Sequence, residues 1–181
     1  VGHSMGGRIS VRYAMGNPER VNGLVLLSAS GAPRKKEASP PMALRLMKNP
    51  IGRFLIKRIW SRNMAKSSLE DMVFDESSIT EEEVDRLWDF STYPGNMDAM
   101  FREFANSWED FNPTEIRGIA TNTLLIWGEE DSICPESMGS WYDSHLPNSA
   151  MVVLPNIGHN PHFECPGRCL DEISSWIGTL S

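Results

Sequence analysis

The stretch VGHSMGG, residues 1–7, decides the fold. It contains the pattern G-x-S-x-G, in which a serine stands on a strained turn between a strand and a helix. Glycine is needed two positions before and after the serine, because side chains there would collide with neighbouring backbone. Ser4 is therefore a candidate nucleophile, and the amide of Met5 a candidate oxyanion donor. The alternatives are a plain tight turn or a phosphate loop, but no Lys-Ser or Lys-Thr pair follows.

Three short apolar runs predict the strands of a parallel sheet. They are LVLL at 24–27, TLLIW at 123–127 and AMVVL at 150–154. Each run is continuously apolar and ends in turn residues, which is typical of strands buried on both faces. Helical patterns follow the first turn and the last two runs, at 8–15, 135–146 and 166–180. This order of elements predicts an α/β fold.

An acid and a histidine stand where a serine nucleophile would need them. Asp131 follows the second apolar run, and His159 follows the third. Parallel strands bring their carboxyl ends to one edge of the sheet, where such folds place their sites. A serine hydroxyl needs a base, and the base needs an acid that orients it. Ser4, Asp131 and His159 are therefore the candidate catalytic residues, in the chain order Ser, Asp, His.

Other residues compete for these roles. Glu129 and Glu130 are alternative acids, although we expect them to be turn or surface charges. His162 is an alternative base, but it lacks a preceding glycine and is expected to point away if the loop enters a helix. His3 is expected to support the turn and to point elsewhere, and His145 is expected at the surface near a helix end.

Residues 32–113 form a predicted helical insertion without a convincing strand. The amphipathic stretches lie at 42–47, 51–60, 64–74, 80–90 and 97–108. Thr80 and Glu83 are spaced as a capping box at the start of one of them. Methionine and aromatic residues are dense here, and they form either a small helical core or the lining of an apolar pocket under a lid.

Composition excludes several classes of protein. The 181 residues carry 17 Lys and Arg against 24 Asp and Glu, a net charge of −7, which argues against sequence-independent nucleic-acid binding. No apolar stretch approaches the length of a membrane span. The small, odd number of cysteines, Cys134, Cys165 and Cys169, favours a reducing compartment, so we expect a cytoplasmic protein.

A metal site is the alternative interpretation of the C-terminal part. His159, His162, Cys165 and Cys169 give the spacing H-x2-H-x2-C-x3-C, which offers four soft ligands for zinc. Two prolines at 161 and 166 restrict this backbone, and the usual C-x2-C pair is absent. We therefore expect neither a metal nor a cofactor.

Together these segments resemble the α/β-hydrolase fold superfamily. The resemblance rests on VGHSMGGRISVRYAMGNPERVNGLVLLSA, TLLIWGEEDSICP and LPNIGHNPHFECP. It is strongest to lidded, cofactor-free serine hydrolases, which include esterases and the C–C bond hydrolases of aromatic-ring breakdown. It implies that Ser4 is the nucleophile, His159 the general base and Asp131 its partner. Serine at the first position departs from haloalkane dehalogenases and epoxide hydrolases, which use aspartate there.

The resemblance also predicts the organisation of the chain. Residues 1–31 and 114–181 would be the C-terminal part of the parallel sheet, and 32–113 a cap between strands. Members of the superfamily have about five strands before the elbow helix, whereas this sequence starts at Val1 with the elbow itself. We therefore expect a fragment whose first apolar run exposes an edge, and which alone folds poorly and has little activity.

The expected function of the parent protein is hydrolysis of an ester or similar acyl bond in a small, largely apolar substrate. Carbon–carbon bond hydrolysis by the same residues is one alternative. A non-catalytic binding protein of the same fold is the other.

Overall fold

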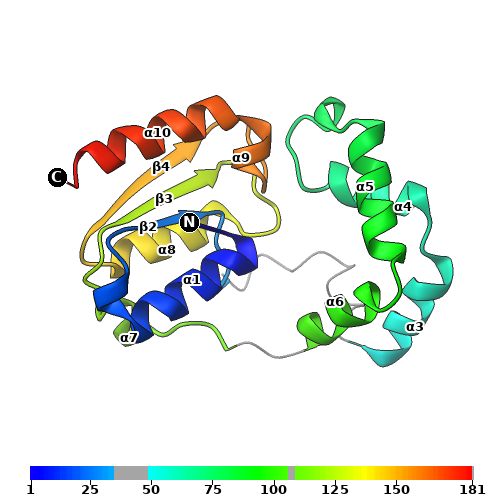
Figure 1. Cartoon of the computed structure of the whole chain (residues 1–181), viewed down its shortest axis with the longest axis horizontal. Coiled ribbons are helices and arrows are strands. Elements are labelled where there is room, and N and C mark those ends of the chain that lie inside the picture. Colours follow the sequence, from blue (N-terminus) through cyan, green and yellow to red (C-terminus); the bar gives the residue numbers. More distant parts are fainter. Residues whose placement is uncertain (35–48, 106–108, 181) are drawn as a thin grey trace.

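The computed structural model describes residues 1–34, 49–105 and 109–180, and within them a parallel sheet (Figure 1). Its strands are β1 (Gly2–His3), β2 (Leu24–Leu27), β3 (Thr123–Gly128) and β4 (Ser149–Leu154). They are paired in parallel in the order β1-β2-β3-β4. The α/β prediction is confirmed, and the three predicted strands lie where the apolar runs placed them.

Helices cover both faces of the sheet (Figure 1). The helices α1 (Ser4–Gly16) and α8 (Glu136–His145) lie on one face, and α10 (Pro166–Gly178) lies on the other. Two buried clusters correspond to these faces. Val11 and Tyr142 pack with Leu26 and Leu125 in the first, and Cys169 of α10 packs with the second. Alternate residues of β2 and β3 therefore face different helices, which explains why these strands are apolar without alternation.

Two predictions about strand exposure are wrong. The faces of β2 are covered, since its four residues are at most 5% exposed and pack in the clusters under the helices on both sides of the sheet. Its edge is partly covered as well, because β1 pairs with Leu26 and Leu27. In contrast, β4 is not buried on both faces, since most of its side chains are partly exposed and Val153 is 37% exposed. Within the described residues β4 is an edge strand, paired with β3. A continuous apolar run thus predicts the strand but not whether it lies inside the sheet or at its edge.

The described part of the insertion contains helices joined by turns and, as predicted, no strand. Its helices are α3 (Pro50–Ile59), α4 (Arg62–Glu70), α5 (Glu81–Thr92) and α6 (Asn96–Ala105). They lie beyond the carboxyl ends of the strands (Figure 1). Of the predicted stretches, 42–47 and the end of 97–108 fall outside the described residues. The capping box is confirmed, because Thr80 Oγ1 accepts from the Glu83 amide and the Glu83 carboxylate accepts from the Thr80 amide.

Short elements complete the chain. The 3-10 turns are Pro18–Arg20 and Glu76–Ser78, and the short helices are α7 (Pro113–Arg117) and α9 (Pro161–Glu164). Neither α7 nor α9 was predicted, because each is too short to show a helical period. The amide of Phe111 donates to the carbonyl of Gly31 at 2.8 Å. This bond brings the two ends of the helical segment side by side.

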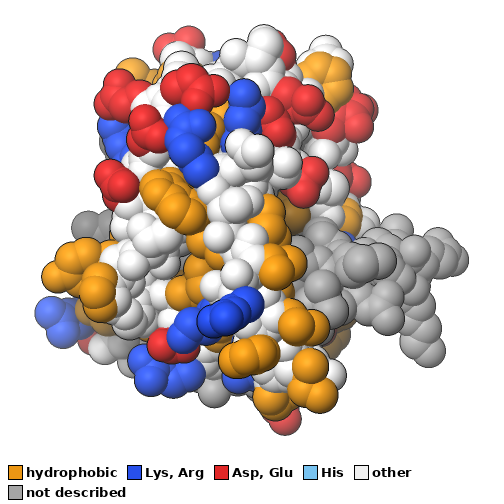
Figure 2. All heavy atoms as spheres, turned by 90° about the vertical axis from the view of Figure 1, so that its right-hand side faces the viewer, with side chains coloured by type: hydrophobic (Ala, Val, Ile, Leu, Met, Phe, Trp, Pro, Cys, Tyr) orange, Lys and Arg blue, Asp and Glu red, His pale blue; other side chains and the backbone are white. Residues whose placement is uncertain are grey.

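The outer face of the insertion helices carries both charged and hydrophobic side chains (Figure 2). Acidic and basic side chains gather on its upper part. Among the ion pairs of these helices, Arg62 bridges Glu81 and Asp85 of α5. Lower on this face hydrophobic side chains reach the surface. The exposed apolar residues of α3 are Ile51, Phe54, Leu55 and Ile59.

Candidate active site

Ser4 occupies a strained turn between β1 and α1. Its φ of +50° lies in the left-handed region, which a residue with a side chain adopts at a cost. The carbonyl of Ser4 accepts from the amide of Ser30 at 3.0 Å and from its hydroxyl at 3.3 Å. The predicted elbow is therefore confirmed, and the chain after β2 holds it in place.

The glycines of the elbow are not equivalent. A Cβ at Gly2 would lie 2.5 Å from the carbonyl oxygen of Gly6, so a side chain is excluded there as predicted. At Gly6 itself a Cβ would meet nothing within 4 Å in the described part of the chain, which contradicts the expectation. The restriction falls on Gly7 instead, where a Cβ would lie 2.4 Å from that of Ala29. Gly7 thus allows α1 to pack closely against the segment after β2.

The three candidate residues meet in space although they come from different ends of the chain. Ser4 Oγ lies 3.0 Å from Nε2 of His159, and Nδ1 of His159 lies 2.9 and 3.0 Å from the two carboxylate oxygens of Asp131. A carboxylate accepts, so Nδ1 carries the proton. Nε2 is then free to accept from the Ser4 hydroxyl. The geometry suits removal of a proton from Ser4.

Asp131 is fixed by its own turn. Its Oδ1 accepts from the amides of Ile133 at 2.9 Å and Cys134 at 2.8 Å. Both Asp131 and His159 are 4% exposed. A buried carboxylate needs such partners, because burial without them costs several kcal/mol. The turn after β3 therefore supplies both the position and the solvation of the acid.

His3 contributes to the site, contrary to the expectation that it points elsewhere. Its Nε2 donates to the carbonyl of His159 at 2.8 Å, and its ring lies between those of His159 and His162, with centroids 4.8 and 4.6 Å away. Burial lowers the pKa of His3 to about 4, with smaller contributions from neighbouring histidines. A sequence gives no sign of this contact, which joins residues 156 positions apart.

The competing residues take other places. Glu129 and Glu130 are exposed in the turn after β3, as expected. His162 lies at the start of α9 against the ring of His3, and burial lowers its pKa. It is His159 whose ring is bonded to both Ser4 and Asp131.

The histidines and cysteines considered as zinc ligands are not arranged around a common point in the described structure. Within the described residues, no three His, Cys, Asp or Glu side chains are grouped so that they could hold a metal ion. Burial raises the pKa of Cys134 and that of Cys169 to about 12 each, which keeps these thiols protonated. Across the same described ranges, no helix has the length and apolar character that crossing a bilayer requires.

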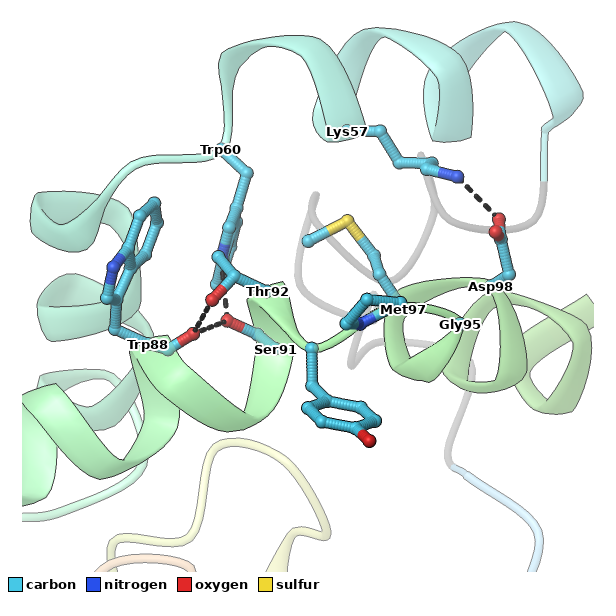
Figure 3. A pocket seen from close by; sticks show the side chains of 10 residues that line it. Lys57, Trp60, Trp88, Ser91, Thr92, Gly95, Met97 and Asp98 are labelled. Atoms are coloured by element: carbon cyan, nitrogen blue, oxygen red, sulfur yellow. Dashed lines mark hydrogen bonds and ion pairs between the residues drawn. The ribbon is translucent and has the colours of Figure 1, made fainter.

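Two hollows lie near the helices of the insertion. One is a groove of about 500 Å³ between α4, α5 and the loop after His159. Most of its lining is apolar, from Leu69, Ile79, Leu87, Phe90 and Phe163. The polar lining residues are Glu83 and Arg86 of α5, His162 of α9, and Asn160 in the loop that carries His159, here called the histidine loop. The other, of about 310 Å³, lies between α3, α5 and α6, where Trp60, Trp88 and Met97 face one another beside the Lys57–Asp98 ion pair (Figure 3). Part of the aromatic content of the insertion therefore lines cavities, while Phe101 is buried.

The chain is similar to known proteins over nearly its whole length. The chain is 33% identical over 177 residues to the uncharacterized hydrolase YugF of Bacillus subtilis (strain 168), covering 98% of this chain and 64% of that protein. It is 27% identical over 169 residues to a 2-hydroxy-6-oxononadienedioate/2-hydroxy-6-oxononatrienedioate hydrolase of Paraburkholderia xenovorans (strain LB400), covering 91% of this chain and 56% of that protein. The chain thus spans less than two thirds of the length of these relatives.

Solved structures show the same fold. The 2-hydroxy-6-oxo-6-phenylhexa-2,4-dienoate hydrolase of Rhodococcus sp. strain RHA1 matches with a TM-score of 0.81 at 21% identity, over 96% of this chain and 61% of that one. A thermophilic esterase from Thermogutta terrifontis matches with a TM-score of 0.72 at 23% identity, over 99% and 64% of the two chains. The family described as "alpha/beta hydrolase fold" matches residues 1–166. The chain therefore belongs to the α/β-hydrolase fold family.

Proposed function

We propose that the protein is a serine hydrolase that cleaves an ester or similar acyl bond of a small, largely apolar substrate. The observation that carries this proposal is the hydrogen-bonded series from Ser4 Oγ to Nε2 of His159, and from Nδ1 of His159 to Asp131. Such a series activates a hydroxyl that is otherwise a weak nucleophile at neutral pH.

The chemistry follows from these positions. Ser4 Oγ attacks the substrate carbonyl while its proton passes to Nε2 of His159, and Asp131 stabilises the imidazolium that forms. The amide of Met5, in the first turn of α1 where amides lack a partner within the helix, donates to the oxyanion. His159 then protonates the leaving group. Water attacks the acyl-enzyme, its proton passes to His159, and Ser4 is regenerated with release of the acid.

We further propose the division of the chain into a core, residues 1–31 and 114–181, and a cap, residues 32–113. The bond between Phe111 and Gly31 supports it, because an insertion must leave and rejoin the core at neighbouring points. The apolar groove supports a substrate that lies under the cap, since it is bordered by cap helices and by the histidine loop.

Hydrolysis of a carbon–carbon bond is the second candidate function. It is favoured by the similarity to the 2-hydroxy-6-oxononadienedioate/2-hydroxy-6-oxononatrienedioate hydrolase of Paraburkholderia xenovorans and to a meta-cleavage product hydrolase of Pseudomonas fluorescens. The same serine and histidine would serve both reactions, so the substrate held in the groove would decide between them.

The test is labelling of the purified full-length protein with a fluorophosphonate probe, which reacts with an activated serine. We expect one label, at Ser4, that is lost in Ser4→Ala and kept in Ser144→Ala, a variant of an exposed serine on α8. Absence of labelling at Ser4 would support a non-catalytic binding protein and reject the proposal. Rates with simple esters and with a dienoate ring-cleavage product then separate the two hydrolytic candidates.

A further inference from the structure

A second carboxylate lies against the loop that carries His159. Glu164, the last residue of α9, accepts from the amide of Gly158 at 3.0 and 2.9 Å with its two oxygens. Oε1 also accepts from the amide of Asn160 at 3.1 Å, and Oε2 from the amide of Phe74 at 2.7 Å. One carboxylate therefore binds the residues on both sides of His159 and a residue of the insertion.

The segment 71–74 of the insertion packs directly against the loop that carries His159. The amide of His159 donates to the carbonyl of Met72 at 2.8 Å. A Cβ at Gly158 would lie 2.8 Å from the Met72 oxygen and 2.9 Å from the Phe74 nitrogen, so backbone touches backbone without space between them. Because the amides at 158, 159 and 160 are all engaged, the loop has little freedom to move independently of the insertion.

We propose that Glu164 is a positioning residue that holds His159 in line with Ser4 and fastens the insertion to the same loop. This inference rests on the proposed function, in which His159 is the base. Hydrogen bonds to an ionised carboxylate are stronger than those between neutral groups, and Glu164 makes them to three different residues. Displacement of a catalytic group by about 1 Å can slow a reaction on the order of 100-fold. The hydrogen bonds of Glu164 are therefore expected to affect catalysis as well as folding.

A purely structural role is the competing explanation, because backbone amides shielded from water need an acceptor wherever they occur. The chain offers a matched control in Glu115, whose carboxylate accepts from the amide of Asn112 at 2.9 Å in the capping box of α7. Both glutamates accept from backbone amides. Glu115 stands apart from the histidine loop, so its loss tests what a missing amide acceptor does to stability alone.

The experiment compares Glu164→Ala, Glu164→Gln and Glu115→Ala in the purified full-length protein, with kcat expressed per folded molecule. For Glu164→Ala we expect kcat to fall about 10- to 100-fold with KM changed less than about threefold, since the base is displaced while the substrate groove remains. Glu164→Gln keeps one acceptor oxygen and should lie between it and the wild type. Glu115→Ala should lower the melting temperature and leave kcat within about twofold.

Amide hydrogen exchange gives a readout that does not depend on turnover. In Glu164→Gln the amides of Gly158, Asn160 and Phe74 should exchange faster than in the wild type, while those of α7 should not change. An unchanged kcat per folded molecule in both Glu164 variants would overturn the inference, as would unchanged exchange at these three amides. If Ser4 is labelled normally in the wild type, such a result rejects the role of Glu164 and leaves the proposed function standing; if Ser4 is not labelled, both fail.

Discussion

The side chain of His3 donates a hydrogen bond to the main-chain carbonyl of His159, with Nε2 and the oxygen 2.8 Å apart. A carbonyl oxygen can only accept, so Nε2 of His3 carries a proton in the neutral ring. The residue before the proposed nucleophile thus supports the backbone of the proposed base. Ser4 and His159 must meet for proton transfer. They are held together by their own contact and by the contact between His3, the neighbour of Ser4, and His159.

Replacement of His3 should weaken the site without removing any of the three proposed catalytic groups. His3→Phe keeps a ring beside His162 but removes the donor, which leaves the carbonyl of His159 without this partner. We expect a loss of about 1–2 kcal/mol in the free energy of unfolding and slower fluorophosphonate labelling of Ser4. His145→Phe, at the end of α8, should label at the wild-type rate. Equal rates in both variants would show that the His3 contact is irrelevant to the site.

A lower pH should destabilise the folded protein through His3. Burial lowers the pKa of His3 from 6.5 to about 4, and that of His162 is also lowered. Between pH 6.5 and about pH 4, His3 is protonated in the unfolded chain but largely neutral in the folded one. The free energy of unfolding therefore decreases as the pH falls through this window. Since His3 is partly exposed, solvent screening reduces its share to about 1–2 kcal/mol.

Urea unfolding at pH 7, 5.5 and 4.5 checks this prediction. The midpoint should drop across the series in the wild type and drop less in His3→Gln, which cannot take up a proton. The carboxylate of Asp131 favours the charged form of His3, and that of Glu164 favours the charged form of His162, so the variant must be compared at each pH. Parallel curves for the two proteins would assign the acid sensitivity to other groups.

The sequence predicts which three residues meet in the candidate site, because each stands at a position with local signals. Ser4 lies in a glycine-marked turn, and Asp131 and His159 each follow an apolar strand by a few residues. Parallel strands bring such positions to one edge of the sheet whatever the rest of the chain does. Fold class and candidate site therefore follow from short-range patterns combined with one general rule of topology.

The supporting contacts cannot be predicted in this way. His3 meets His159 and Glu164 meets Phe74 through contacts between residues far apart in the chain, and nothing in the local pattern marks either pair. The burial of β2 and the exposure of β4 likewise depend on which strands lie beside them. Periodicity reports how a segment is built, whereas these features depend on how segments pack against each other.

Gly158 should tolerate no side chain. A Cβ there would lie within 2.9 Å of backbone atoms of Met72, Val73 and Phe74, none of which can move as a flexible side chain would. We expect Gly158→Ala to lower the free energy of unfolding by about 1–3 kcal/mol and to slow labelling of Ser4, because the histidine loop must shift. Gly167→Ala is the matched change in α10, where a Cβ meets nothing within 4 Å in the described chain.

For Gly167→Ala the stability should stay the same or rise by about 0.5 kcal/mol, since alanine favours the helix. Both variants add one methyl group, so unfolding curves and labelling rates can be compared directly. Equal behaviour of the two would contradict the close packing of segment 71–74 on the loop.

Asp131 offers a way to separate orientation of the base from stability of the turn. Its Oδ1 serves the amides of Ile133 and Cys134, while both carboxylate oxygens face Nδ1 of His159. In Asp131→Asn the amide oxygen can keep the two backbone bonds, and the amide nitrogen then donates towards Nδ1. His159 must then carry its proton on Nε2, where it cannot accept from Ser4.

We therefore expect Asp131→Asn to fold with nearly wild-type stability but to lose about 10³- to 10⁴-fold in kcat. Asp131→Ala should lose activity as well, and in addition about 2–4 kcal/mol of stability, because two amides in the turn lose their acceptor. Unfolding curves and fluorophosphonate labelling of both variants test this pair of outcomes. If Asp131→Asn kept substantial activity, the proton on Nδ1 of His159 would not be what the proposed mechanism depends on, and Asp131 would serve the turn after β3 alone.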